Sequence, residues 1–198
     1  MTVIGITGGV GAGKTRILSV LKEEFLAETL ICDQIADKLM KKGQPAFEAL
    51  VDLLGEEYLG TEGELDKYKL STLIFSDEGK QQKKEVEKIV HPLVRQKLEE
   101  IISTSKNSLI AIESAILIEA GLGSLCDQVW YIHADKNTRV KRLQKEREYS
   151  IEKAKEIIEA QLVEEEFREK ADYVIDNSIS LSVEMIKQRI RKGLQQCL

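Results

Sequence analysis

Eight residues near the start of the chain have the types and spacing that phosphate chemistry needs. Gly8 to Thr15 read GGVGAGKT, which fits the pattern G-x-x-x-x-G-K-[ST], and they follow the apolar segment Val3–Thr7. Glycines allow backbone conformations in which successive N–H groups point at phosphate oxygens. A helix that begins at the end of such a loop favours negative charge at its N-terminus. The pattern therefore predicts a site for the phosphates of a nucleotide.

The same pattern gives the polar side chains of the loop their roles. We expect Lys14 to reach the β- and γ-phosphates of ATP and the hydroxyl of Thr15 to ligate Mg²⁺. The residues expected to contact the nucleotide are Gly9, Gly11, Ala12, Gly13, Lys14, Thr15 and Arg16. The alternative is a glycine-rich turn before a helix, which the Lys-Thr ending disfavours. The dinucleotide pattern G-x-G-x-x-G fails because Lys14 stands at its last glycine, which argues against a nicotinamide enzyme.

A carboxylate follows the next apolar segment of the chain. Asp33 comes directly after Thr29–Cys32. Ligands of open α/β sheets bind at the carboxyl ends of the strands, so this carboxylate should face the phosphates. Asp33 is our candidate for the catalytic base, which accepts the proton of an attacking hydroxyl. Asp33 is also a candidate ligand of Mg²⁺, and Glu113 is a candidate to hold the ion through water. The alternative, an N-cap of a helix that starts at Gln34, is equally consistent with the sequence.

A basic segment follows the fourth predicted strand. Residues 136–147 carry six positive charges against the single carboxylate of Glu146. A nucleotide kinase needs a closing segment, or lid, whose arginines neutralise charge on the transferring phosphoryl group. We therefore predict a lid at about residues 136–161, with Arg142, Arg147 and Arg139 as its candidate arginines. The alternative for any one of them is an ordinary solvated helix face.

A parallel sheet covered by helices would position these residues, because short apolar runs alternate with longer amphipathic ones. The candidate strands are Val3–Thr7, Leu30–Asp33, Leu109–Glu113, Val129–His133 and Tyr173–Asp176. The candidate helices are 14–25, 34–41, 46–54, 65–75, 79–103, 137–148, 151–161 and 181–194, and Pro92 is expected to open a helix. Residues 43–103 contain no obvious core strand, so we interpret them as a helical insertion. Trp130 and Tyr131 are expected in the core.

The composition of the chain argues against several classes of protein and partner. The chain has 198 residues, 42% of them hydrophobic, which suits one domain with a substantial core. Its net charge of −5 argues against nucleic acid or membrane surfaces as partners. The cysteines Cys32, Cys126 and Cys197 lack C-x-x-C spacing, which indicates reduced thiols rather than zinc ligands or disulfides. No apolar run approaches a membrane span, so we expect a cytoplasmic protein, either a monomer or a weak homo-oligomer.

Taken together, these motifs resemble those of the dephospho-coenzyme A kinase family. The resemblance runs nearly end to end, and its most particular pieces are the phosphate loop, Asp33 with Ile35-Ala36, Val90-His91-Pro92-Leu93, Glu113 to Glu119, Arg142-Leu143, Gln161, and Ala171 to Asn177. It implies an α/β fold of the P-loop NTPase type, with a parallel five-stranded sheet flanked by helices. In one domain of residues 1–198, the core would comprise about 1–42 and 104–198, and an acceptor-binding insertion about 43–103.

The resemblance also implies an activity and assigns residues to it. The expected reaction transfers the γ-phosphate of ATP to the 3′-hydroxyl of dephospho-coenzyme A and gives coenzyme A and ADP, the final step of coenzyme A synthesis. Asp33 matches the family's proposed base, Arg142 its lid arginine, and Asn177 a position near the adenine of ATP. The arginine that usually follows four residues after Arg142 is displaced here to Arg147.

Two other functions share part of this pattern. Another small-molecule kinase, acting on a nucleoside monophosphate or a different alcohol, would use the same loop and lid, and its acceptor would distinguish it. A regulatory nucleotide-binding protein is disfavoured because the D-x-x-G string at Asp52–Gly55 ends an amphipathic helix rather than following a strand. The sequence also contains no N-K-x-D signature for guanine.

Overall fold

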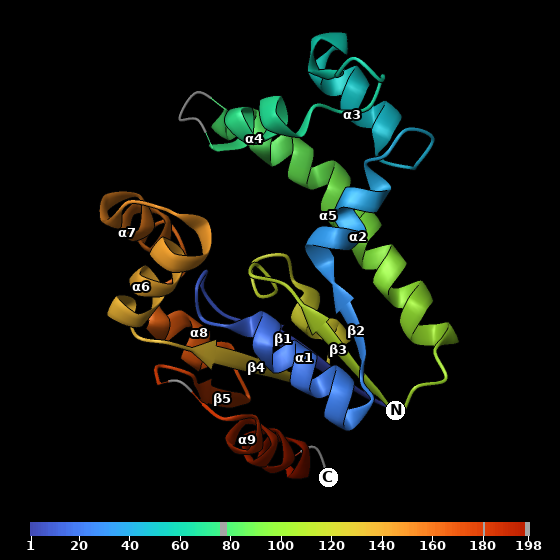
Figure 1. Ribbon diagram of the computed structural model, residues 1–198. Helices are drawn as coiled ribbons and strands as arrows, with labels where there is room; N and C mark the ends of the chain where they lie inside the picture. Colours follow the sequence, from blue (N-terminus) through green and yellow to red (C-terminus); the bar gives the residue numbers. More distant parts are fainter. Residues whose placement is uncertain (76–78, 180, 197–198) are drawn as a thin grey trace. The chain divides into compact units, whose positions relative to one another are not determined.

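The structure is a computed structural model that describes residues 1–75, 79–179 and 181–196, apart from the side chains of residues 74 and 75. Cys197 lies outside the described residues. The chain forms two compact units, one made of Met1–Ile31 and Lys106–Leu198 and the other of Cys32–Ser105 (Figure 1). The helical insertion expected at residues 43–103 falls inside the second unit, which also contains the residues immediately before it.

The first unit is built on a five-stranded sheet in the order β2-β3-β1-β4-β5 (Figure 1). All of its strand pairs are parallel, so the strands end at the same edge. The predicted α/β fold with a parallel five-stranded sheet is therefore confirmed. The strands are β1 (Thr2–Thr7), β2 (Glu28–Ile31), β3 (Leu109–Glu113), β4 (Gln128–His133) and β5 (Tyr173–Asp176).

Two helices, α1 (Lys14–Phe25) and α9 (Val183–Gln195), pack together with one face of this sheet. Trp130 of β4 is fully buried in this layer, and its indole N–H donates to Oε1 of Gln128 at 2.7 Å. A buried indole needs such a partner, and its core position agrees with the expectation from sequence. The helix residues buried in the layer lie at helical spacing: Ile17, Leu18, Val20, Leu21, Ile186 and Ile190.

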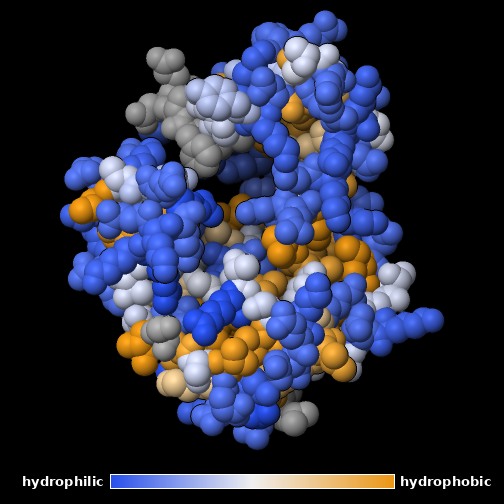
Figure 2. Space-filling view, viewed as in Figure 1, coloured by the Kyte–Doolittle hydropathy of each residue, from blue (hydrophilic) through white to orange (hydrophobic). Residues whose placement is uncertain are grey.

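A helical hairpin of α6 (Lys136–Arg147) and α7 (Ile151–Glu159) follows β4. Both helices begin at a side-chain cap, because Asp135 accepts from the Thr138 N–H and Ser150 accepts from the Lys153 N–H. Most of the surface of this hairpin on the face shown in Figure 2 is hydrophilic. The hairpin has a small apolar cluster of its own, which contains Val140, Leu143, Ala154 and Ile158.

The short helix α8 (Glu164–Lys170) was not predicted from the sequence. Its Phe167 stacks on Tyr131 of β4, with ring centroids 4.9 Å apart. The charge pattern of this segment could have predicted the helix. Three glutamates lie in its first turn, and Arg168 and Lys170 lie in its last turn, as the helix dipole favours. The two tight 3₁₀ turns, at Glu56–Tyr58 and Leu122–Leu125, were not predicted either.

The second unit is helical and is organised around α5 (Lys80–Thr104) (Figure 1). α2 (Cys32–Leu39), α3 (Phe47–Leu54) and α4 (Lys67–Phe75) all pack against this long helix. The buried residues of α5 recur every four positions, at Val86, Val90, Val94 and Leu98, which places them on one face.

The second strand and the helix after it begin earlier in the chain than predicted. β2 covers Glu28–Ile31 because Glu28 and Thr29 pair with β3, whereas the sequence pattern suggested Leu30–Asp33. α2 then starts at Cys32, so Asp33 lies inside its first turn. It is neither the last residue of a strand nor the N-cap, although a carboxylate in this turn still interacts favourably with the helix dipole.

The sequence led us to expect that Pro92 opens a helix. This expectation is wrong, because Pro92 lies inside α5. Proline has no N–H, so the carbonyl four residues earlier, that of Lys88, lacks its usual donor. Both residues are exposed, so water can satisfy this carbonyl while the buried valines keep the helix packed.

Candidate active site

The phosphate loop joins β1 to α1 in a conformation that only glycine adopts easily. Gly8, Gly11 and Gly13 have φ angles of +143°, +77° and +90°. A Cβ on Gly8 would overlap the carbonyl oxygen of Ile132, and one on Gly13 would overlap Nδ2 of Asn177. These positions therefore need glycine both for the backbone angle and for space.

The N-terminus of α1 presents a favourable environment to an anion. Gly13 occupies the N-cap position and provides no side-chain cap, and the first turn of α1 contains no acidic residue. The helix dipole and the N–H groups of this turn then favour negative charge. This is the local chemistry that a phosphate group requires.

Lys14 lies in the first turn of α1 and curls back over the loop. Its Nζ donates to the carbonyl of Gly8 at 2.9 Å and to that of Gly9 at 3.5 Å, and it lies 3.6 Å from Oε1 of Glu113 at the end of β3. The two charged side chains are only 12% and 15% exposed. The ammonium is thus held beside the loop, where it can meet phosphate oxygens.

Arg142 and Asn177 hold the middle of the loop from the other side. The Arg142 guanidinium donates to the carbonyls of Gly11 and Ala12, each at 3.1 Å, and to the carbonyl of Asn177 at 2.7 Å. The Asn177 side chain is buried and donates from Nδ2 to the Ala12 carbonyl at 2.7 Å. The structure therefore brings these two predicted site residues together with the loop.

Of the other two candidate lid arginines, one contacts the phosphate loop and the other is exposed. Arg139, in the first turn of α6, donates to the carbonyl of Val10 at 2.8 Å. Arg147 is the last residue of α6 and its side chain is exposed. In this structure the arginines that contact the loop bind its carbonyl oxygens, whereas sequence reasoning assigned them only to phosphate charge.

The remaining predicted residues lie at helix starts. Thr15 is exposed in the first turn of α1, and the neighbouring Arg16 donates to the carbonyl of Leu181 at 2.5 Å. Asp33 is exposed in the first turn of α2, two positions after the end of β2 along the chain. Among the described residues, no group of three or more His, Cys, Asp or Glu side chains could hold a metal ion by itself.

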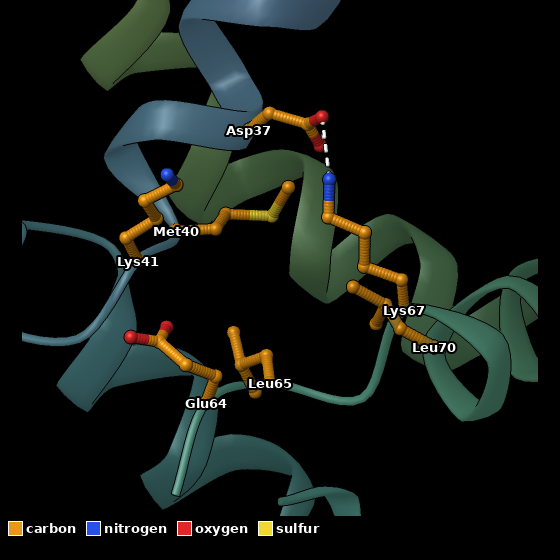
Figure 3. Close-up of a pocket in the computed structure, with 7 residues that line it drawn as sticks. All are labelled: Asp37, Met40, Lys41, Glu64, Leu65, Lys67 and Leu70. Atoms are coloured by element: carbon orange, nitrogen blue, oxygen red, sulfur yellow. Dashed lines mark hydrogen bonds and ion pairs between the residues drawn. The ribbon is translucent and has the colours of Figure 1, made fainter. Parts of the chain in front are cut away.

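The second unit contains a pocket of about 240 Å³ (Figure 3). Met40, Leu65 and Leu70 give it an apolar surface, while Asp37 and Lys67 form an ion pair of 2.6 Å at its side. Lys41 and Glu64 complete the lining, so the four charged groups cancel. Such a pocket suits an uncharged ligand segment that has both apolar and hydrogen-bonding groups.

The fold and the loop together define a class of protein. A parallel sheet whose central strand leads through a glycine-rich loop into a helix, with arginines of a helical hairpin on that loop, is the architecture of a P-loop kinase. The sequence profile of the dephospho-CoA kinase family matches residues 2–182. The chain belongs to the dephospho-CoA kinase family, as its motifs predicted, and is a phosphotransferase that uses ATP as co-substrate.

Individual relatives agree with this assignment. A dephospho-CoA kinase from Oceanobacillus iheyensis is 33% identical over 198 residues, which cover 98% of this chain and 96% of the relative. One from Bacillus anthracis is 34% identical over 178 residues, with 88% of each chain covered.

Solved structures support the same fold. TT1252 from Thermus thermophilus matches with a TM-score of 0.84 and 29% identity, over 100% of this chain and 97% of that one. The dephospho-CoA kinase from Campylobacter jejuni has a TM-score of 0.66 and 23% identity, with 98% and 96% covered. A shikimate kinase from Bacteroides thetaiotaomicron has a TM-score of 0.58 and 13% identity, with 98% and 97% covered. The last two show the kinase fold alone.

Sequence reasoning missed one residue that supports the loop and the two residues that cap α6. Gln161, whose side chain contacts Val10, entered only as one residue of the family resemblance. Asp135 and Thr138 were not singled out, although the spacing D-x-x-T at a helix start is a recognisable capping signal.

Proposed function

We propose that this protein transfers the γ-phosphate of ATP to the 3′-hydroxyl of dephospho-coenzyme A, forming coenzyme A and ADP in the cytoplasm. The observation that carries the proposal is the phosphate loop with Lys14 held beside it, in a chain of the dephospho-CoA kinase family. Within the described part of the chain, no helix is both long and apolar enough to cross a membrane.

The loop residues bind and orient the nucleotide. The amides of residues 11–15 and the ammonium of Lys14 would hold the β- and γ-phosphates. The positive φ angles of Gly11 and Gly13 allow a backbone in which successive N–H groups point at one anion. Arg142 and Asn177 support this conformation through the loop carbonyls. Phosphoryl transfer depends mainly on such positioning and on charge stabilisation, since its transition state is loose.

The exposed hydroxyl of Thr15 and the exposed carboxylate of Asp33 suit Mg²⁺, which prefers oxygen ligands. When bound, the ion would neutralise part of the phosphate charge. Glu113, beside Lys14, is a further carboxylate that can reach it through water.

Asp33 is the proposed base. Its carboxylate would accept the proton of the acceptor hydroxyl while that oxygen forms a bond to the γ-phosphorus. The bond between the γ-phosphorus and the bridging oxygen breaks, and ADP leaves with the electron pair. Arg142 and Arg147 are the proposed lid arginines that would screen the charge on the transferring group. The support for Asp33 is its place in the first turn of α2, two positions after the end of β2, and its match to the family's proposed base.

We also assign acceptor binding to the second unit. Its neutral, partly apolar pocket beside the Asp37–Lys67 pair suits the amide-containing arm of dephospho-coenzyme A better than its diphosphate, since the charges of the lining cancel. Another small-molecule kinase is the second candidate, and the likeness of the fold to shikimate kinases favours it over a regulatory role.

A panel of acceptors tests the proposal. Purified protein with Mg-ATP is offered dephospho-coenzyme A, nucleoside monophosphates and shikimate, and ADP release is followed. We expect dephospho-coenzyme A to give the highest kcat/KM by a wide margin. Preference for a monophosphate or shikimate would favour the second candidate, and ATP binding without turnover on any acceptor would indicate a binding protein.

A further inference from the structure

Val10, in the middle of the phosphate loop, is held through both of its backbone groups. Its N–H donates to Oε1 of Gln161 at 2.9 Å, and its carbonyl accepts from Nε of Arg139 at 2.8 Å. Nη2 of Arg139 donates to the same oxygen of Gln161 at 2.7 Å. The three residues close a ring of hydrogen bonds, which we call the Val10 clamp.

The chemistry of the clamp defines the orientation of Gln161. Both of its neighbours, the Val10 N–H and the Arg139 guanidinium, are donors, so the amide oxygen rather than the amide nitrogen must face them. One acceptor atom on the segment after α7 therefore joins the loop to α6.

Close packing surrounds the clamp. A Cβ on Gly9 would overlap the Arg139 guanidinium, and one on Gly11 would lie 3.0 Å from the Arg139 carbonyl oxygen. The Val10 side chain packs against the apolar cluster of the α6–α7 hairpin. The loop is thus fastened to the hairpin by its backbone and its side chain at the same residue.

Arg139 occupies an unfavourable environment for a cation. Burial lowers the pKa of its guanidinium, and the oxygens that it binds belong to the neutral groups of Val10 and Gln161. Partial burial of a charge among neutral partners is unfavourable, and the hydrogen bonds that Arg139 makes to Val10 and Gln161 offset part of this cost.

We propose that Arg139 and Gln161 are positioning residues, which keep the phosphate loop in its ATP-binding conformation by holding the Val10 peptide groups. The Val10 N–H donates to the Gln161 side chain. The amides of residues 11–15, which follow Val10, remain the proposed phosphate donors. A loop whose conformation is fixed by the protein loses less conformational entropy when it binds phosphate. Arg139 then acts on nucleotide affinity, a role different from screening the transferring phosphoryl group.

Two substitutions of Gln161 test the clamp directly. The dissociation constant of ATP is measured by calorimetry without any acceptor. The experiment therefore rests on the proposed function only in its choice of ATP as the nucleotide. Gln161→Leu removes the acceptor at similar size and should weaken ATP binding about tenfold. Gln161→Glu keeps an oxygen that can accept both donors and should stay within about twofold of the parent.

Substitutions of Arg139 separate geometry from charge. Arg139→Lys keeps the charge but cannot bind Val10 and Gln161 together through a planar fork, so both Arg139→Lys and Arg139→Met should weaken ATP binding. The double variant Arg139→Met, Gln161→Leu should be little weaker than either single variant, because both remove the same ring. Lys141→Met, which removes an exposed charge of α6, is the control and should bind ATP as the parent does.

Kinetics and melting distinguish positioning from a purely structural role. Positioning predicts a raised KM for ATP, an unchanged KM for the acceptor, and a kcat within a fewfold range. A lower melting temperature with an unchanged dissociation constant of ATP in the folded fraction would overturn the inference. A lower kcat at constant KM would do the same, and so would a Gln161→Leu variant that binds ATP as tightly as the parent. If the parent itself fails to bind ATP, the proposed function fails instead.

Discussion

The ammonium of Lys14 lies 3.6 Å from the carboxylate of Glu113, which stands at the end of the strand beside β1. Both side chains are largely shielded from water, so salt screens their attraction less than it would at an exposed pair. Protein groups therefore hold Lys14 beside the loop.

Removing this ammonium should abolish useful activity. We expect Lys14→Met to lower turnover by about 10²–10³, since the ammonium is a main source of charge stabilisation for the phosphates. Lys22→Met, at an exposed lysine in the last turn of the same helix, is the matched control and should retain the parent rate. Steady-state ADP release checks both variants, and a fully active Lys14→Met would refute the assigned role.

Replacing the proposed base should separate turnover from nucleotide binding. Asp33→Asn keeps the size of the side chain but cannot accept the hydroxyl proton, so kcat should fall by about 100-fold or more. The dissociation constant of ATP should change little. The control Asp52→Asn, at an exposed acid of α3, should leave both quantities unchanged. Parent-like turnover of Asp33→Asn would mean that another group serves as base.

The pocket of the second unit should affect the acceptor and not the nucleotide. Lys67→Met breaks the ion pair with Asp37 and should raise the KM for dephospho-coenzyme A about fivefold, which corresponds to about 1 kcal/mol. The KM for ATP should stay the same. Lys38→Met, at an exposed lysine of α2 that does not line the pocket, is the matched control. Equal acceptor KM values for the two variants would place acceptor binding elsewhere.

The cap of α6 should make stability depend on pH. Thr138 donates to Asp135 from its N–H at 2.9 Å and from Oγ1 at 2.7 Å, and these hydrogen bonds lower the pKa of the carboxyl below its ordinary value of 3.8. The stabilisation is therefore complete above that value and is lost as the pH falls through the lowered pKa. Asp135→Ala should cost about 1 kcal/mol of unfolding free energy at pH 7.

Urea denaturation at several pH values checks this expectation. The difference between the parent and Asp135→Ala should shrink as the pH falls below 3.8 toward 2, because protonation weakens the cap in the parent. Asp135→Asn supplies a neutral cap, so its stability relative to Asp135→Ala should not change over this range. A constant difference between the parent and Asp135→Ala would argue against the lowered pKa.

Local patterns were sufficient for most of the fold. The apolar runs at β1, β3, β4 and β5 and the helical periodicity of α1 and α9 appear in the structure close to their predicted bounds. These signals are readable because side-chain alternation and turn chemistry act between near neighbours in the chain. Where a boundary depended on a distant partner the prediction failed, as at β2, whose first residues are strand only because β3 lies beside them.

The sequence by itself determined the chemistry of the phosphate loop, since the glycines of GGVGAGKT, its lysine and its threonine lie within eight consecutive residues. Only the tertiary structure decided what holds that loop. Val10 and Gln161 are 151 positions apart, and Arg142 reaches back 131 positions to the Gly11 carbonyl. Such contacts have no local periodicity, because they exist only after the sheet and the α6–α7 hairpin have packed.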